Sequence, residues 1–217
     1  MSGTDFLYPF IEGDERDTDR LLADLAASAV AKGGQSEALR NETLASYEDE
    51  LDHVAEAMAR RFATGGRLFT FGNGGSATDA GLTASFFATP PRQRALPARS
   101  LAGDAAVITA IGNDIGFELV FSRQLIAHGR PEDMAMGFST SGNSDNVLRA
   151  FAEAHRRGMF CVGLAGYGGG KMAACADLDH CLVVDSESVH RIQETQSALV
   201  YGLWSALQER LATTEIR

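Results

Sequence analysis

The apolar positions in the N-terminal part of the chain recur at helical spacing. Between residues 18 and 32, leucines and a valine repeat in a pattern that predicts an amphipathic helix ending at the two glycines at 33–34. A longer run with a similar period covers residues 36–63 and predicts a second helix that stops at the glycines at 65–66. The chain therefore begins with two helices that each present one apolar face.

From residue 67 onward, short apolar runs alternate with helical segments and glycine-rich turns. This alternation predicts a parallel sheet covered by helices on both faces, with right-handed crossovers. The fold class we expect is α/β, with a five-stranded parallel sheet flanked by helices. The expected strands are 67–71, 98–101, 133–138, 160–165 and 180–184, and the expected helices are 77–88, 104–112, 117–126, 143–157, 170–174 and 189–211.

Composition narrows the class of protein. The chain has 217 residues and a formal net charge of -10, which argues against a nucleic-acid or membrane partner. The N-terminus has no signal peptide pattern, no apolar run is long enough to span a membrane, and the three cysteines lack the spacing of a zinc or redox site. We therefore expect a cytoplasmic protein with an acidic arm (1–16), N-terminal helices (17–66) and an α/β domain (67–217) that forms one unit with those helices.

The first segment with candidate chemistry is Gly-Asn-Gly-Gly-Ser at 72–76, between an expected strand and an expected helix. A backbone that turns tightly after a strand directs its N–H groups toward the start of the next helix. Unpaired amides and the positive end of the helix dipole hold anions there. Ser76 adds a hydroxyl at the same place, and the segment predicts a phosphate-binding loop.

A second polar loop, residues 139–144, follows the expected strand at 133–138 and leads into a helix. The hydroxyls of Ser139, Thr140, Ser141 and Ser144 are a dense set of donors without net charge, which suits a phosphate monoester that must bind and leave. Each loop alone also fits a helix cap with a polar turn. The pair favours binding, because ligands of parallel sheets lie beyond the carboxyl ends of the strands, where both loops fall.

These motifs together resemble the sugar isomerase (SIS) fold, and most closely its sedoheptulose 7-phosphate isomerase (phosphoheptose isomerase) branch. The resemblance covers roughly residues 18–211 and rests on the order and spacing of short motifs. They are Gly-Asn-Gly-Gly-Ser at 72–76, Gly-Asn-Asp at 112–114, Gly-Phe at 116–117, Phe-Ser-Arg at 121–123, Ser-Thr-Ser-Gly-Asn-Ser at 139–144, Gly-Tyr-Gly-Gly-Gly at 166–170 and Arg-Ile-Gln-Glu at 191–194.

The resemblance implies that Asn113 and Asp114 lie near the sugar hydroxyls and that the two loops bind the phosphate of the sugar. The loop residues concerned are Asn73, Gly74, Ser76, Ser139, Thr140, Ser141 and Ser144. It also implies a binding role for Gln193 in the retained motif, and Arg191 is a candidate phosphate or subunit-interface contact. The family forms homotetramers in which terminal helices pack in a central bundle and active sites lie at subunit boundaries. The partners we expect are therefore a sugar phosphate and further copies of the chain.

Three of four positions separate this chain from the isomerising members of the family, and the fourth, Gln193, is retained. Those members carry a His and a Glu on the helix after the first loop, and a Gln and a His on the last helix, which can hold zinc and move protons between C1 and C2. The corresponding residues here are Leu82, Phe86, Gln193 and Tyr201. Leucine and phenylalanine cannot bind a metal or transfer a proton, and tyrosine is a poor base at neutral pH. We therefore expect no cofactor and no zinc site.

Two other residues could supply an acid and a base, since His190 and Glu194 flank Gln193. Alternatively, Glu194 pairs with a basic neighbour and His190 is solvated.

The sequence is compatible with three functions. The one we expect is a phosphosugar-binding protein with a ligand-binding or regulatory role. The alternative is an active aldose–ketose sugar-phosphate isomerase with a relocated acid/base set, and the third is a scaffold that binds a protein partner and no sugar. The sequence leaves open whether the chain is an enzyme.

Overall fold

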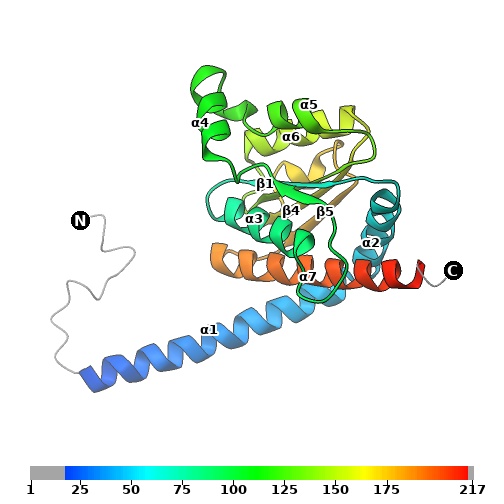
Figure 1. Cartoon of the computed structure of the whole chain (residues 1–217). Helices are drawn as coiled ribbons and strands as arrows, with labels where there is room; N and C mark the ends of the chain where they lie inside the picture. Colours follow the sequence, from blue (N-terminus) through cyan, green and yellow to red (C-terminus); the bar gives the residue numbers. More distant parts are fainter. Residues whose placement is uncertain (1–17, 215–217) are drawn as a thin grey trace. The chain divides into compact units, whose positions relative to one another are not determined.

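The computed structural model describes residues 18–214 of the chain (Figure 1). The contacts within the chain define two compact units that meet between Leu39 and Arg40. The acidic arm predicted at residues 1–16 lies outside the described residues, and the predicted boundaries after residues 16 and 66 stay predictions. No helix within residues 18–214 is long and apolar enough to cross a membrane.

The glycines at 33–34 do not end the first helix, so the sequence prediction was wrong there. Helix α1 (Thr18–Ser46) continues through them, and the break falls at Tyr47, before α2 (Glu48–Ala63). A helical glycine costs only about 1 kcal/mol relative to alanine, and a long helix tolerates that cost. Tyr47 instead contacts the sheet, because its hydroxyl donates to the carbonyl of Val183 (3.3 Å) and accepts from the Val183 N–H (2.9 Å).

The α/β part contains the predicted five-stranded parallel sheet, in the order β2-β1-β3-β4-β5. Strands β1, β3 and β4 are buried along their whole length, as expected for strands covered on both faces. The chain runs outward from β1 to the β2 edge and then returns to place β3 on the other side of β1, so the topological switch point lies between β1 and β3. The strands are β1 (Leu68–Gly72), β2 (Ala98–Ser100), β3 (Met134–Ser139), β4 (Phe160–Gly166) and β5 (His180–Val184).

Helices cover both faces of the sheet (Figure 1). On one side α5 and α6 enclose an aromatic core, in which the ring centroids of Phe121 and Phe151 lie 5.5 and 5.2 Å from that of Phe71. On the other side lie α2, α3 and α7.

Two predicted helices differ in the structure. The predicted helix at 117–126 is divided into a 3-10 turn and α5, and the predicted helix at 170–174 is a 3-10 turn. The remaining helices are α3 (Gly75–Ala88), α4 (Ala105–Asp114), α5 (Ser122–His128), α6 (Asp145–Arg156) and α7 (Val189–Thr214), with 3-10 turns at Phe117–Leu119 and Met172–Ala174.

A buried carboxylate joins β1 and β3 at their amino ends. Asp133 is fully buried, and its side chain accepts hydrogen bonds from the backbone N–H groups of Arg67 (2.8 Å) and Arg130 (3.0 Å). The Arg67 guanidinium donates to the same carboxylate at 3.2 and 2.7 Å. Pairing and full hydrogen bonding are the conditions under which a charge can be buried. This network fixes the two strands at the end of the sheet opposite the polar loops.

Candidate functional site

The two polar loops lie side by side at the switch point. In the β1–β3 pair Gly72 stands opposite Phe138, so the loops that follow these two residues begin next to each other. A reciprocal pair of amide hydrogen bonds connects them. Asn73 Nδ2 donates to Asn146 Oδ1 (2.8 Å), and Asn146 Nδ2 donates to Asn73 Oδ1 (2.9 Å). The structure therefore brings the first loop together with the helix that follows the second.

Neither helix that follows these loops is capped by a side chain. The N-cap residues are Gly74 for α3 and Ser144 for α6, and neither side chain accepts a hydrogen bond from its helix. Helix α4 shows the usual arrangement, since the Asp104 carboxylate accepts from two backbone N–H groups at 3.0 and 3.2 Å. The N–H groups of residues 75–76 and 145–146 have no acceptor within the described chain. Two helix starts thus offer free donors and the positive ends of their dipoles to an anion.

The hydroxyls predicted to bind phosphate differ in accessibility. Ser141 is exposed and Thr140 is half-buried, whereas Ser76 and Ser139 are only 6% and 3% exposed. Ser139 Oγ lies 3.0 Å from Ser144 Oγ, so these two hydroxyls already share a hydrogen bond. Thr140 and Ser141 are therefore the hydroxyls that a ligand reaches most directly.

Gly142 sets the shape of the second loop. Its φ of +64° lies in the left-handed region that favours glycine, and an added Cβ would lie 1.9 Å from the carbonyl oxygen of Gly169. Asn143 joins the same two segments, since its Nδ2 donates to the Ser141 carbonyl (2.8 Å) and its Oδ1 accepts from the Lys171 N–H (3.0 Å). The backbone around Gly169 and Lys171 thus holds the second loop in one conformation.

A polar pocket lies beside the first turns of α7. It encloses about 290 Å³ and is lined by Asp79, His190, Gln193, Glu194 and Ser197. The structure therefore brings the predicted residues His190, Gln193 and Glu194 together, and His190 and Glu194 are exposed. Burial raises the pKa of Asp79, and the hydrogen bond from Gln193 opposes that rise. The pocket combines two carboxyl groups and an imidazole, which are groups able to move protons.

Gln193 connects this polar pocket to the first loop. Its Nε2 donates to Asp79 Oδ2 (2.7 Å). A Cβ built on Gly75 would lie 2.6 Å from the same Nε2, so the amide packs directly against the start of α3. Only glycine at residue 75 permits this close approach.

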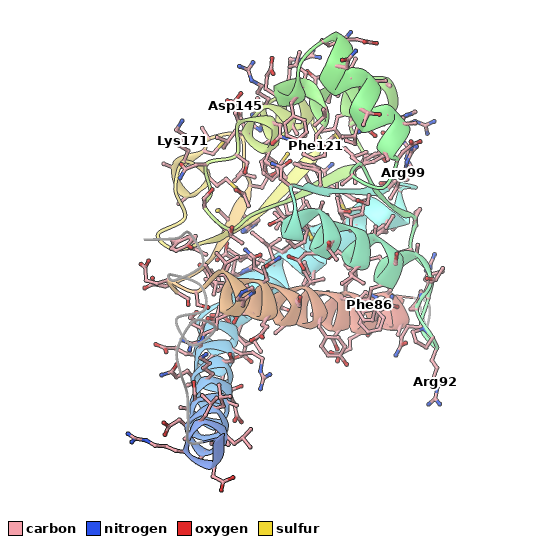
Figure 2. The ribbon with its side chains drawn as sticks, turned by 90° about the vertical axis from the view of Figure 1, so that its left-hand side faces the viewer. Phe86, Arg92, Arg99, Phe121, Asp145 and Lys171 are labelled. Carbon is pink, nitrogen blue, oxygen red and sulfur yellow. The ribbon has the colours of Figure 1, made fainter. Side chains whose placement is uncertain are left out.

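A second, apolar pocket of about 270 Å³ adjoins the polar one, and Asp79 and Ser197 line both. Phe86 lies where α3 packs against α7 (Figure 2). Its ring centroid is 4.3 Å from that of Trp204 and 5.9 Å from that of Tyr201. One apolar pocket therefore contains all three residues that, by the resemblance, replace the family's zinc ligands: Leu82, Phe86 and Tyr201. Its lining residues are Asp79, Leu82, Thr83, Phe86, Phe138, Ser197, Val200 and Tyr201.

Two predicted residues are not brought to the loops. Asn113 and Asp114 are exposed at the end of α4, where Asn113 Nδ2 donates to Asp114 Oδ1 (2.8 Å). No hydrogen bond links either residue to a polar loop within residues 18–214. Arg191 is half-buried in the first turn of α7, next to His190.

Sequence reasoning missed two residues of the site, Asp79 and Asn146. Both are polar residues near the start of a helix that follows a polar loop, and Asn146 is 3% exposed. Their positions in the sequence could have indicated this role. A polar residue that falls among the apolar positions of a helix is directed inward and needs a hydrogen-bond partner. The partners themselves could not be read from the sequence.

The fold and the loops define an α/β protein with two candidate anion-binding loops at the switch point of its sheet. The SIS domain family model matches residues 23–166, and the chain belongs to this family. The phosphoheptose isomerase of Rhodospirillum rubrum is 43% identical over 165 residues, which cover 74% of this chain and 87% of the relative. That of Burkholderia pseudomallei (strain K96243) is 46% identical over 143 residues, covering 65% of this chain and 72% of the relative.

Solved structures agree with the sequence relatives. Phosphoheptose isomerase GmhA from Neisseria gonorrhoeae matches with a TM-score of 0.79 at 36% identity, covering 85% of this chain and 99% of that one. A phosphoheptose isomerase from Francisella tularensis gives the same TM-score at 30% identity, covering 85% of this chain and 98% of that one. The predicted SIS fold and the resemblance to the phosphoheptose isomerase branch are confirmed.

Proposed function

We propose that this protein binds a sugar phosphate at its paired loops and does not carry out a zinc-dependent isomerisation, so that its role is ligand binding or regulation. The observation that carries the proposal is an apolar pocket beside an intact pair of loops. The uncapped starts of α3 and α6, together with Thr140 and Ser141, supply uncharged hydrogen-bond donors that can bind a phosphate anion. The names of the relatives support a sugar phosphate as the ligand class.

The residues at the family's metal positions do not suit zinc. Zinc takes nitrogen, sulfur or carboxylate ligands, and Leu82 and Phe86 offer none of these. Gln193, the retained residue, is engaged by Asp79. Within residues 18–214, no group of three or more His, Cys, Asp or Glu side chains is arranged to hold a metal ion. We therefore propose that the protein works without a metal cofactor.

Sedoheptulose 7-phosphate provides the direct test. The purified chain should bind it in a calorimetric titration and should not convert it, with or without added zinc. Zinc-dependent conversion would overturn the proposal. A Thr140→Ala/Ser141→Ala variant should bind at least five-fold more weakly, since each lost hydrogen bond is worth about 1 kcal/mol. Ser85→Ala, at an exposed position of α3, is the matched control. Unchanged affinity in the double variant would show that these two hydroxyls do not bind the phosphate. Failure of the native chain to bind any sugar phosphate would favour a scaffold that binds a protein partner and no sugar.

An active sugar-phosphate isomerase is the second candidate function. The polar pocket favours it, because His190, Glu194 and Asp79 lie together beside Gln193. A base of this kind would have to remove a proton from a carbon next to a carbonyl group. If a rate is detected, His190→Ala and Glu194→Gln should each lower it strongly, while His155→Ala on the exposed face of α6 should not. Rates unchanged in both variants would exclude this assignment.

Self-association is a further part of the proposal, with a homotetramer and sites at subunit boundaries. It is supported by apolar side chains on α1, where Leu22, Leu25 and Val30 are 59%, 47% and 77% exposed. A sedimentation mass close to the 23.1 kDa of one chain would contradict it.

We also propose a cytoplasmic location, and the net charge of -10 argues against nucleic acid or a membrane as a partner.

A further inference from the structure

The apolar pocket lies next to the polar pocket and to the second loop. It shares Asp79 and Ser197 with the polar pocket. Its wall includes Phe138, which directly precedes Ser139 in the second loop. A phosphate ester held by the two loops therefore has two neighbouring spaces for its other end, one polar and one apolar.

The apolar pocket has almost no free hydrogen-bond donors. Thr83 Oγ1 donates to the Asp79 carbonyl (2.8 Å), and Ser197 Oγ donates to the Gln193 carbonyl (3.0 Å). Both hydroxyl protons are therefore used within their own helices. One oxygen of the Asp79 carboxylate, Oδ2, accepts a hydrogen bond from Gln193 (2.7 Å). Among the polar lining groups, this leaves the hydroxyl of the exposed Tyr201 as a hydrogen-bond donor.

A ligand end with several hydroxyls is poorly matched to such a wall. Each hydroxyl that enters exchanges water for a wall that is mostly apolar and returns few of its hydrogen bonds. An apolar group of similar size gives up no hydrogen bonds to water when it enters. It also removes its own apolar surface, and that of Leu82 and Phe86, from water. An aromatic ring can also stack against Phe86 or Tyr201. A volume of about 270 Å³ accommodates a six-membered ring.

We propose that the ligand of this site is a phosphate ester whose far end carries an apolar group, such as an aryl or alkyl substituent. This inference rests on the proposed function, since it takes the loops to hold the phosphate. The apolar pocket then selects among phosphate esters by the chemistry of the opposite end. The residues Leu82, Phe86 and Tyr201, which stand at the family's metal positions, become specificity residues.

The test compares two esters with the same phosphorylated sugar. D-Glucose 6-phosphate has a free hydroxylated end, and phenyl β-D-glucoside 6-phosphate carries a phenyl ring there. Trp204 is the only tryptophan of the chain and packs 4.3 Å from Phe86, centroid to centroid, so its fluorescence reports on this pocket. We expect the phenyl ester to bind at least ten-fold more tightly and to change Trp204 emission, whereas glucose 6-phosphate should change it little.

Leu82→Gln provides the matched variant. Leu82 is 64% exposed, so the substitution should leave folding intact while adding polar atoms to the pocket wall. The preference for the phenyl ester should fall to three-fold or less. Ile126→Gln changes a 42% exposed residue on α5, outside both pockets, and should leave the preference unchanged.

The outcomes separate this inference from the proposed function. Binding of glucose 6-phosphate as tight as that of the phenyl ester, or tighter, overturns the inference and leaves phosphate binding intact. Failure of both esters and of sedoheptulose 7-phosphate to bind overturns both. A Leu82→Gln variant that keeps the preference but loses sedimentation mass shows that the pocket is covered by a second copy of the chain, which also overturns the inference.

Discussion

The amide pair between Asn73 and Asn146 gives a quantitative prediction about how the two loops are held. The change is a double-mutant cycle of Asn73→Ala, Asn146→Ala and both together. Two neutral hydrogen bonds join the amides at 2.8 and 2.9 Å, and each contributes about 0.5–1.5 kcal/mol net. The coupling free energy of the cycle should therefore be about 1–3 kcal/mol.

The two single variants should not be equivalent. Asn146 is 3% exposed, so Asn73→Ala leaves a buried amide without its partner, at a cost of about 1–3 kcal/mol. Asn73 is half-buried, and in Asn146→Ala its amide can turn to water. We expect Asn73→Ala to lower the free energy of unfolding more than Asn146→Ala. The double variant should be close to Asn73→Ala alone.

Urea unfolding followed by Trp204 fluorescence measures these free energies, and a titration with sedoheptulose 7-phosphate measures the effect on the loops. The control cycle uses the exposed ion pair of Asp145 and Arg149 on α6, joined at 2.7 Å, whose coupling should stay below about 0.5 kcal/mol. If the effects of Asn73→Ala and Asn146→Ala add to within about 0.3–0.5 kcal/mol, the amide pair does not hold the loops together and the reasoning is wrong.

Three further predictions concern the loop, the buried charge and pH. Gly142→Ala should abolish binding of phosphate esters in calorimetry, because a Cβ would lie 1.9 Å from the Gly169 carbonyl oxygen. Asp133→Ala should lower the free energy of unfolding in urea melts by about 1–3 kcal/mol for each of the backbone N–H groups of Arg67 and Arg130 that it leaves without an acceptor. Burial raises the pKa of Asp79 above 3.8 in the folded state, so the stability it contributes is complete below that value and is lost as pH rises through the folded pKa. The urea midpoint of the native chain should therefore fall as pH rises above 3.8, and the Asp79→Asn variant should show a smaller fall.

The sheet and the two loops could be predicted because their signals are local. Each strand is a short apolar run, and each loop is a cluster of glycine, serine and asparagine at the end of one run. Parallel pairing then places the ends of β1 and β3 at the same edge. The adjacency of the two loops thus follows from topology, without knowledge of any side-chain contact.

The interactions that fix the site could not be predicted, because they join residues far apart in the sequence. Asn73 and Asn146 are separated by 73 positions, and Asp79 and Gln193 by 114. The predicted helix break failed for another reason. The glycines at 33–34 stay helical because a long helix tolerates their cost, and the break falls at Tyr47, which bonds to Val183 across 136 positions.

Helix α3 carries both the backbone donors of the first loop and the positions at which this chain departs from the isomerase pattern. Its first N–H groups belong to the first loop, Asp79 follows one turn later, and Leu82 and Phe86 come in the next two turns. Positions three and four apart lie on one face of a helix, so all these groups face the same site. Only the later turns differ from the isomerase pattern, and the backbone donors of the first turn do not depend on the side chains that follow. On the proposed function, phosphate recognition rests on the first turn of α3, and substitutions at Leu82 and Phe86 are expected to change which ligands bind without weakening phosphate binding.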